Sequence, residues 1–281
     1  MTDWSIWTFQ FAEGRLPLDF VRGTPVASNQ GTTPVPMIFS LLQSSDGERI
    51  VVDTGFASGA SMTGPGFKDF VRSDEILARH GIAADTIDTL VLTHLHFDHA
   101  GNLDAFPNAR IFVQLYEYES WKKVLGRYGA GGITKDRWVF SSLDENNFRA
   151  LDRAIAQGRV IFLDGDHHLC DGVTCRLARD THSFGIQWLE VETSGGPFAL
   201  AGDVCYSYFC AERMWPPGYL QGNPWNMIEE IERIRNVAGD DLARLLPGHD
   251  IEIFKRHRSG ESHGVKVAEL HLAGGHTSLV S

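Results

Sequence analysis

The stretch Thr93-His94-Leu95-His96-Phe97-Asp98-His99-Ala100-Gly101 decides how the rest of this sequence is interpreted. It places three imidazoles and one carboxylate between an apolar run and a turn of small residues. Such nitrogen and oxygen ligands suit zinc and its neighbours in the first transition row. In an extended segment His94 and His96 point to the same side, whereas Asp98 and His99 diverge by about 100° if a helix starts there. The stretch is therefore expected to supply ligands to two metal ions, and the alternative is a polar loop with unrelated histidines.

Composition describes an ordinary globular protein. The chain has 281 residues, of which 43% are hydrophobic and 22% are charged. This length fits one large domain or two small ones, and no linker rich in Pro, Ser and Gly separates two halves. A single domain over residues 1–281 is therefore predicted. The formal net charge of −11 argues against nucleic acid as a partner, because the only basic cluster, residues 255–258, is short.

The sequence also bears on the cellular compartment. No apolar stretch reaches the roughly 18 residues that a membrane-spanning helix needs, and residues 1–4 lack the basic start of a secretory signal. A cytoplasmic protein without a membrane partner is predicted. The cysteines form two Cys-x4-Cys pairs, at positions 170 and 175 and at positions 205 and 210. In a reducing compartment they are expected to be free thiols rather than disulfides.

Periodicity gives a coarse secondary structure. Alternating or wholly apolar runs between turn residues predict strands over residues 4–11, 36–43, 48–53, 87–92, 110–114, 159–163, 173–179, 186–193, 198–202 and 242–246. Apolar residues at helical spacing predict helices over residues 67–80, 116–127, 144–157 and 225–237. In the first of these, Ser73-Asp74 is an alternative point at which the segment splits or a new helix is capped. Residues 12–35, rich in Gly, Pro, Thr and Asn, are predicted to form a long loop that serves as a rim or a dimer contact. The residues after 250 are predicted to form a frayed tail.

The predicted strands fall into two groups, residues 1–114 and residues 158–250, each accompanied by helices. Two sheets packed together with helices outside would bring loops from both groups to one shared edge. Asp53 leaves a predicted strand beside Gly55. It either supports a metal site from behind or closes a simple Asx turn.

Three later positions complete the candidate ligand set. Among His167, His168 and His182, we favour His182, because it lies between two predicted strands as the first histidines do. Asp203 ends an apolar strand, where a carboxylate is costly unless a charge or a metal pairs with it. Its alternative role is to cap the following turn. His249 repeats the pattern of an apolar strand, a glycine turn and a ligand.

With these residues in order, the chain resembles the metallo-β-lactamase-fold superfamily. It is most similar to the N-acyl-homoserine lactonase-like branch, because Tyr206 follows Asp203 by three residues and because of the segment Gly248-His249-Asp250. The segment Asp180-Thr-His-Ser-Phe-Gly185 departs from the Pro-Gly-His-Thr/Ser-Pro-Gly common in the superfamily. The surrounding pocket is therefore not inferred from the resemblance.

The resemblance implies an α+β protein with a four-layer αββα sandwich. It implies that His94, His96 and His182 hold one divalent metal, that Asp98, His99 and His249 hold another, and that Asp203 bridges the two. Zinc is the metal expected, with iron, manganese and cobalt as alternatives.

The function implied is the opening of a lactone by a hydroxide that bridges the two metals. Tyr206 would donate a hydrogen bond to the developing oxyanion, and Asp98 would help to move the proton; the alternative for Tyr206 is a packed core tyrosine. The substrate would be a small molecule such as an N-acyl-homoserine lactone, a quorum-quenching activity. A thioester or amide/ester hydrolase is the alternative, with a nuclease or a non-catalytic or redox metal protein less favoured. A homodimer is left open.

Overall fold

The computed structural model describes residues 2–23, 31–57, 66–129, 140–218, 221–239 and 241–280. Its strands form two sheets. The larger sheet contains Trp4–Pro17 (β1), Thr32–Ser44 (β2), Arg49–Val52 (β3), Thr89–Val91 (β4), Arg110–Gln114 (β5), Val160–Leu163 (β6), Arg258–Ser262 (β12) and Val265–His271 (β13), in the order β12-β13-β1-β2-β3-β4-β5-β6. The smaller sheet contains His167–Cys170 (β7), Val173–Arg179 (β8), Gly185–Val191 (β9), Phe198–Gly202 (β10) and Leu245–Pro247 (β11), in the order β11-β10-β9-β8-β7.

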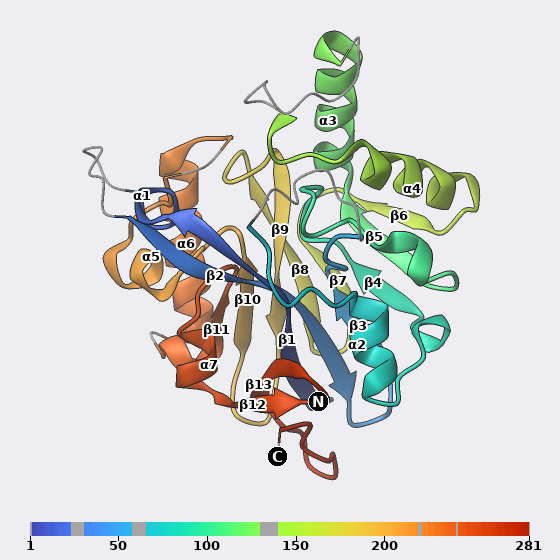
Figure 1. Ribbon diagram of the computed structural model, residues 1–281, viewed down its shortest axis with the longest axis vertical. Coiled ribbons are helices and arrows are strands. Elements are labelled where there is room, and N and C mark those ends of the chain that lie inside the picture. The colour runs from blue at the N-terminus through green and yellow to red at the C-terminus, as the bar shows by residue number, and fades with distance from the viewer. Residues whose placement is uncertain are drawn as a thin grey trace.

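Helices surround the two sheets (Figure 1). They are Leu18–Arg22 (α1), Ser73–Arg79 (α2), Leu115–Tyr128 (α3), Glu145–Ala156 (α4), Tyr208–Arg213 (α5), Pro224–Ala238 (α6) and Ile253–Arg256 (α7), with 3-10 turns at Ala84–Thr86 (η1), Leu103–Ala105 (η2) and Leu242–Arg244 (η4). Helix α6 packs on β8 and β10, whereas α2 packs on β1 and α4 on β6. This arrangement confirms the predicted α+β class and the αββα sandwich. None of the helices described here is long and apolar enough to cross a membrane.

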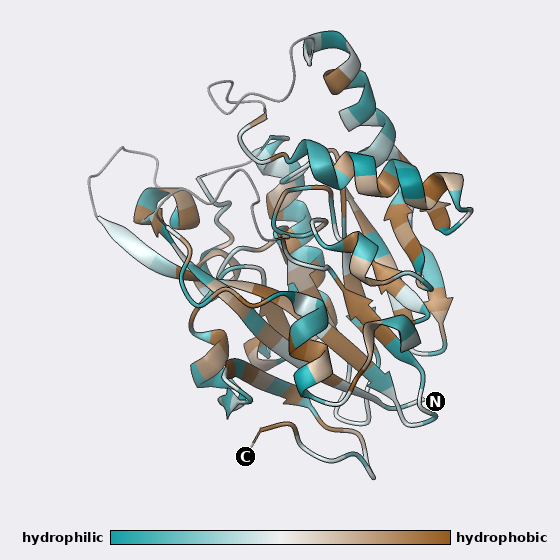
Figure 2. Cartoon of the chain, turned by 45° about the vertical axis from the view of Figure 1, so that its right-hand side comes forward, coloured by the Kyte–Doolittle hydropathy of each residue, from teal (hydrophilic) through white to brown (hydrophobic). Residues whose placement is uncertain are grey.

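Burial on both faces of the larger sheet explains how its strands pack. In β1, Trp4 and Ile6 pack between the two sheets, whereas Phe9 and Phe11 pack against the outer helices. Side chains alternate between the faces of a strand, so apolar residues at both even and odd positions are buried. The apolar strands lie inside and the polar helix faces outside in Figure 2. All four cysteines are free, as predicted.

The predicted loop over residues 12–35 is wrong in its described part. Strand β1 continues to Pro17 and pairs with β2 from Thr32 onward, and α1 follows β1 directly. Strand β3 pairs only with residues 40–43 of β2, so Pro34 lies where β2 extends beyond β3. A strand tolerates proline there because no ladder hydrogen bond to that side is lost. The arm formed by the paired ends of β1 and β2 beyond β3 therefore has a composition typical of a loop.

Three further predictions are corrected. The tail after residue 250 is ordered, because β13 pairs with both β12 and β1 and His276 stacks on Trp7. The division at residue 158 is also wrong, since β6 pairs in parallel with β5 in the larger sheet. The helix predicted over 67–80 is reduced to α2, because Lys68 forms a β-bridge with Glu13.

Candidate metal centre and substrate pocket

The four segments that carry the predicted ligands meet at one edge of the sandwich. His94, His96, Asp98 and His99 follow β4, and His182 lies between β8 and β9. Asp203 follows β10, and His249 follows β11. In the smaller sheet β10 and β11 are parallel, so Asp203 and His249 leave the same end of that sheet, and both lie within 3.6 Å of the segment that follows β4. All seven side chains are buried.

These seven side chains form two groups. The first candidate metal group is His94, His96, His182 and Asp203, and the second is Asp98, His99 and His249; in each group one ligand atom per residue lies within 4.8 Å of the others. By contrast, His167 and His168 are exposed on β7. The structure thus brings together the seven residues selected from the sequence. The residues present offer two positions for divalent metal ions.

Asp203 lies between the two groups. Its Oδ2 is 3.2 Å from His182 Nε2 and 3.9 Å from His94 Nε2. Its Oδ1 is 3.1 Å from His249 Nε2 and 3.5 Å from His99 Nε2. The two oxygens of one carboxylate therefore face different groups, which is the geometry of a bridging ligand.

The chemistry of the donor set fits metal ions. In the described part of the chain, the buried atoms His94 Nε2 and His99 Nε2 make no hydrogen bond. A buried polar atom without a partner is costly, and a cation at this place would remove that cost. Asp98 Oδ2 also lies 3.6 Å from both His99 Nε2 and His249 Nε2. Imidazole and carboxylate donors converging in this way are the ligands expected for zinc, iron, manganese or cobalt.

The three histidines of the first group have lowered pKa values, which keep them in the neutral form that binds a metal. Burial lowers the pKa of His96 to about 4 and that of His182 to about 3, and burial also lowers the pKa of His94. These three imidazoles are therefore neutral at pH 7, and only a neutral imidazole binds a metal.

The second group behaves differently. Burial opposes a charge on His99, but Asp98 and Asp203 raise its pKa well above the usual value. The pKa of His249 is raised in the same way, against burial, chiefly by Asp203. Without a metal, protons on these histidines balance the buried carboxylates. Metal binding would displace those protons, because ligand histidines must be neutral.

Neighbouring groups orient several of these rings. Asp53 Oδ2 accepts a hydrogen bond from His99 Nδ1 at 2.8 Å, and Asp53 also accepts from Thr93 N and Thr93 Oγ1. Of the two roles considered for Asp53, the structure shows the support of a candidate ligand. The Pro36 carbonyl accepts from His249 Nδ1 at 3.0 Å.

Gln221 supports the first group, although no sequence pattern indicated this residue. Gln221 Oε1 accepts from His96 Nε2 at 2.9 Å, which leaves His96 Nδ1 directed at His182 Nε2, 3.0 Å away. Fixing one ring nitrogen sets the tautomer and aims the other nitrogen at the metal. The glutamine lies 125 residues from His96 in the chain, so only the tertiary structure reveals the contact.

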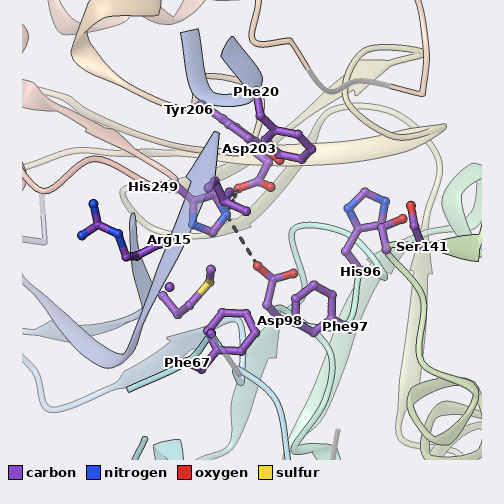
Figure 3. A pocket seen from close by; sticks show the side chains of 15 residues that line it. Arg15, Phe20, Phe67, His96, Phe97, Asp98, Ser141, Asp203, Tyr206 and His249 are labelled. Carbon is purple, nitrogen blue, oxygen red and sulfur yellow. Dashed lines mark ion pairs between the residues drawn. The ribbon is translucent and has the colours of Figure 1, made fainter. Parts of the chain in front are cut away.

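A cavity of about 460 Å³ opens beside the two groups (Figure 3). Its polar end is formed by His96, Asp98, Asp203, Tyr206 and His249, and Figure 3 shows Asp98 directed toward His249. Its apolar wall contains Leu16, Phe20, Met37, Phe67 and Phe97. Leu16, at the end of β1, and Phe20, in α1, lie within residues 12–35, which were predicted to form a loop, whereas Met37 lies in a predicted strand. The cavity thus joins an apolar region to the candidate metal groups.

Tyr206 is buried and lines this cavity. Its ring centroid lies 5.1 Å from that of His249 and 5.2 Å from that of His182. Its backbone carbonyl accepts a hydrogen bond from His249 N, which ties the turn after β10 to the turn after β11. Tyr206 therefore belongs to the wall of the site, beside one residue of each candidate metal group.

Comparison with known proteins gives the family. Residues 34–249 match the metallo-beta-lactamase superfamily. The chain belongs to this superfamily. The matched region begins in β2 and ends at His249, so it contains all seven residues of the two candidate metal groups. The resemblance inferred from the sequence is confirmed.

Within the superfamily, the chain is similar to N-acyl homoserine lactonases. It is 28% identical over 250 residues to the N-acyl homoserine lactonase of Bacillus thuringiensis, covering 82% of this chain and 89% of that one. The crystal structure of a quorum-quenching N-acyl homoserine lactone lactonase covers 90% of this chain and 94% of its own, with a TM-score of 0.70 and 24% identity. The structure of AidC, a dizinc quorum-quenching lactonase, covers 89% and 88%, with a TM-score of 0.67 and 15% identity. These two structures share the fold of this chain.

Proposed function

We propose that this protein is a metal-dependent hydrolase that opens lactones, with N-acyl homoserine lactones as the substrate class. The observation that carries the proposal is the position of Asp203, which faces both candidate metal groups at the polar end of an apolar cavity. The similarity to the lactonase of Bacillus thuringiensis supports the choice of substrate.

The residues fit a pair of divalent metal ions, and we propose that both ions are zinc. His94, His96 and His182 would hold one ion, Asp98, His99 and His249 the other, and Asp203 would bind both. When bound, two such ions would lower the pKa of a water molecule toward neutral pH and would activate a carbonyl group as Lewis acids. The AidC structure, described as a dizinc lactonase of the same fold, supports zinc.

Two side chains would act on the substrate directly. Tyr206 would donate a hydrogen bond to the carbonyl oxygen as negative charge develops on it. Asp98 would take up the proton of the attacking water and pass it to the ring oxygen as the carbon–oxygen bond breaks. One water is consumed, one ester bond is broken, and the product is an open-chain hydroxy acid. Asp98 and Tyr206 both line the cavity, as these roles require.

The cavity suits a substrate with a polar head and an apolar tail. The lactone would lie at the end formed by Asp98, Tyr206 and His249, and the acyl chain would lie against Phe20 and Met37. Burying an acyl chain there contributes about 0.8 kcal/mol per methylene. A preference for longer acyl chains is therefore expected until the apolar wall is filled.

A substrate panel tests this proposal. Zinc-loaded protein is assayed by acid release with N-acyl homoserine lactones of several chain lengths, and with simple lactones, aryl esters, thioesters and phosphodiesters. We expect the highest kcat/KM for the N-acyl homoserine lactones and no turnover by an Asp98→Ala variant. Faster turnover of a thioester or an aryl ester would show that the alternative activity, hydrolysis of a thioester or ester, is the main one.

A further inference from the structure

Glu117, on α3, is completely buried although it belongs to neither candidate metal group. Its Oε1 accepts hydrogen bonds from Leu95 N at 3.1 Å and from Trp121 Nε1 at 2.9 Å. Its Oε2 accepts from Gly185 N at 2.7 Å, and Ser183 Oγ lies 2.8 and 2.9 Å from the two oxygens. An ionised carboxylate only accepts hydrogen bonds, so these four donors match it.

Three of the four donors come from the two segments that carry the histidines of the first candidate metal group, and the fourth, Trp121, lies on α3 itself. Leu95 lies between His94 and His96, and Ser183 follows His182. One carboxylate therefore connects two ligand-bearing segments that are distant in sequence. Hydrogen bonds to a charged acceptor are shorter and stronger than neutral ones, so this connection is stiff.

Close packing of α3 prevents these segments from moving apart. A Cβ atom on Gly185 would lie 2.6 Å from Glu117 N, so the helix backbone touches the start of β9. The Trp121 ring, which is bonded to the same carboxylate, lies 6.0 Å from the His96 ring and 4.9 Å from the Phe184 ring. A shift of α3 would therefore move both segments.

The second candidate metal group is held by different partners. Asp53 orients His99, and the Pro36 carbonyl orients His249. None of the four donors to Glu117 adjoins His249, and Leu95 is nearer in sequence to His94 and His96 than to His99. A change at Glu117 therefore acts first on one of the two metal positions.

We infer that Glu117 is a positioning residue that sets the affinity of the His94, His96 and His182 position for its metal without touching the ion. The inference rests on the proposed two-metal centre, and it is tested by metal retention without any substrate. Removing such a supporting residue typically weakens metal binding 10- to 100-fold.

The test uses three single variants. Glu117→Gln keeps the size of the side chain but turns an N–H group toward a donor, and Glu117→Asp keeps the charge. Glu119→Gln is the matched control, because Glu119 is exposed on the same helix. Each zinc-loaded protein is dialysed against rising chelator concentrations, zinc per chain is measured, and the thermal unfolding of the metal-free form is recorded.

We expect Glu119→Gln to release its two ions at the same chelator concentrations as the wild type. Glu117→Gln should release one ion at a roughly 10- to 100-fold lower chelator concentration and keep the other, and Glu117→Asp should lie between. In an Asp98→Ala background, which weakens the second position, Glu117→Gln should leave no tightly held zinc.

Two results would overturn the inference. One is retention of both ions by Glu117→Gln at the wild-type chelator concentration. The other is equal weakening of both positions together with a lower melting temperature of the metal-free protein, which indicates a purely structural carboxylate. If zinc is retained as expected but the protein does not hydrolyse lactones, the proposed substrate is refuted and this inference stands. If the wild type takes up no metal, both are refuted.

Discussion

Asp53 accepts a hydrogen bond from His99 Nδ1 at 2.8 Å, and His99 Nε2 is thereby turned toward Asp98 and Asp203. Asp53 has a left-handed backbone with a φ of 63°, a conformation that Asp and Asn adopt more readily than most residues. Asp53→Asn therefore preserves the backbone and removes the charge behind His99. We expect zinc affinity at the second position to fall about 10- to 100-fold, as measured by competition with a chromophoric chelator.

The control for that experiment is the first metal position, because Asp53 accepts its hydrogen bond from His99, a histidine of the second group. Its affinity should change less than that of the second position. Equal affinity of the wild type and Asp53→Asn at the second position would show that the contact between Asp53 and His99 has no role in metal binding.

Replacing Asp98 or His249 by alanine should abolish lactone hydrolysis and leave the fold largely intact. Both side chains line the cavity and belong to the second candidate metal group. A loss of at least about a hundredfold in kcat/KM is expected, because proton transfer and metal binding are both impaired. Activity, zinc content and far-ultraviolet circular dichroism are measured together. His167→Ala, at an exposed histidine on β7, serves as the control with full activity.

The seven candidate ligands were accessible from the sequence because most of the segments that carry them share a local pattern. An apolar strand ends, a turn begins, and a histidine or carboxylate follows, as at Leu92 to His94 and at Leu246 to His249. Strands that are buried side by side present such ends at one edge of a sheet. The alternation of strands and helices predicted two packed sheets with helices outside, and the resemblance to the superfamily implied the αββα sandwich.

Long-range pairing could not be predicted in this way. Strand β13 pairs with β1, and Trp7 lies opposite Glu269, although the whole chain separates them. Periodicity shows that a segment is a strand but not which strand lies beside it. For the same reason the support given by Gln221 and Glu117 to distant histidines has no local signature, apart from a glutamate placed four residues before a buried tryptophan.

Tyr206→Phe isolates the hydroxyl group of Tyr206 from the packing of its ring. The ring lies against His182 and His249, and phenylalanine keeps those contacts. Losing a donor to a developing oxyanion typically lowers kcat about 10²- to 10³-fold. We expect a loss of that size with two zinc ions per chain retained. A kcat equal to that of the wild type would show that Tyr206 serves only in packing.

His257 should make the stability of the fold depend on pH at a place outside the proposed site. Its Nε2 lies 3.2 Å from the hydroxyl of the buried Tyr208. Burial, and then the neighbouring Arg256, lower the pKa of His257 to about 4, from a usual value of 6.5, with Asp241 opposing. Between these two values the unfolded chain binds a proton that the folded chain does not, so stability falls as pH is lowered from 6.5 to about 4.

The contribution of His257 to this loss is at most about 1.4 kcal/mol per pH unit. Because the buried histidines of the candidate metal groups also titrate, the informative quantity is the difference between the wild type and His257→Gln. Urea unfolding of both metal-free proteins at several pH values measures it. The wild type should lose stability more steeply than His257→Gln below pH 6.5, and the two curves should become parallel below about pH 4, where both forms of the chain are protonated at this histidine. Parallel curves throughout would mean that His257 has the same pKa in the folded and unfolded chains.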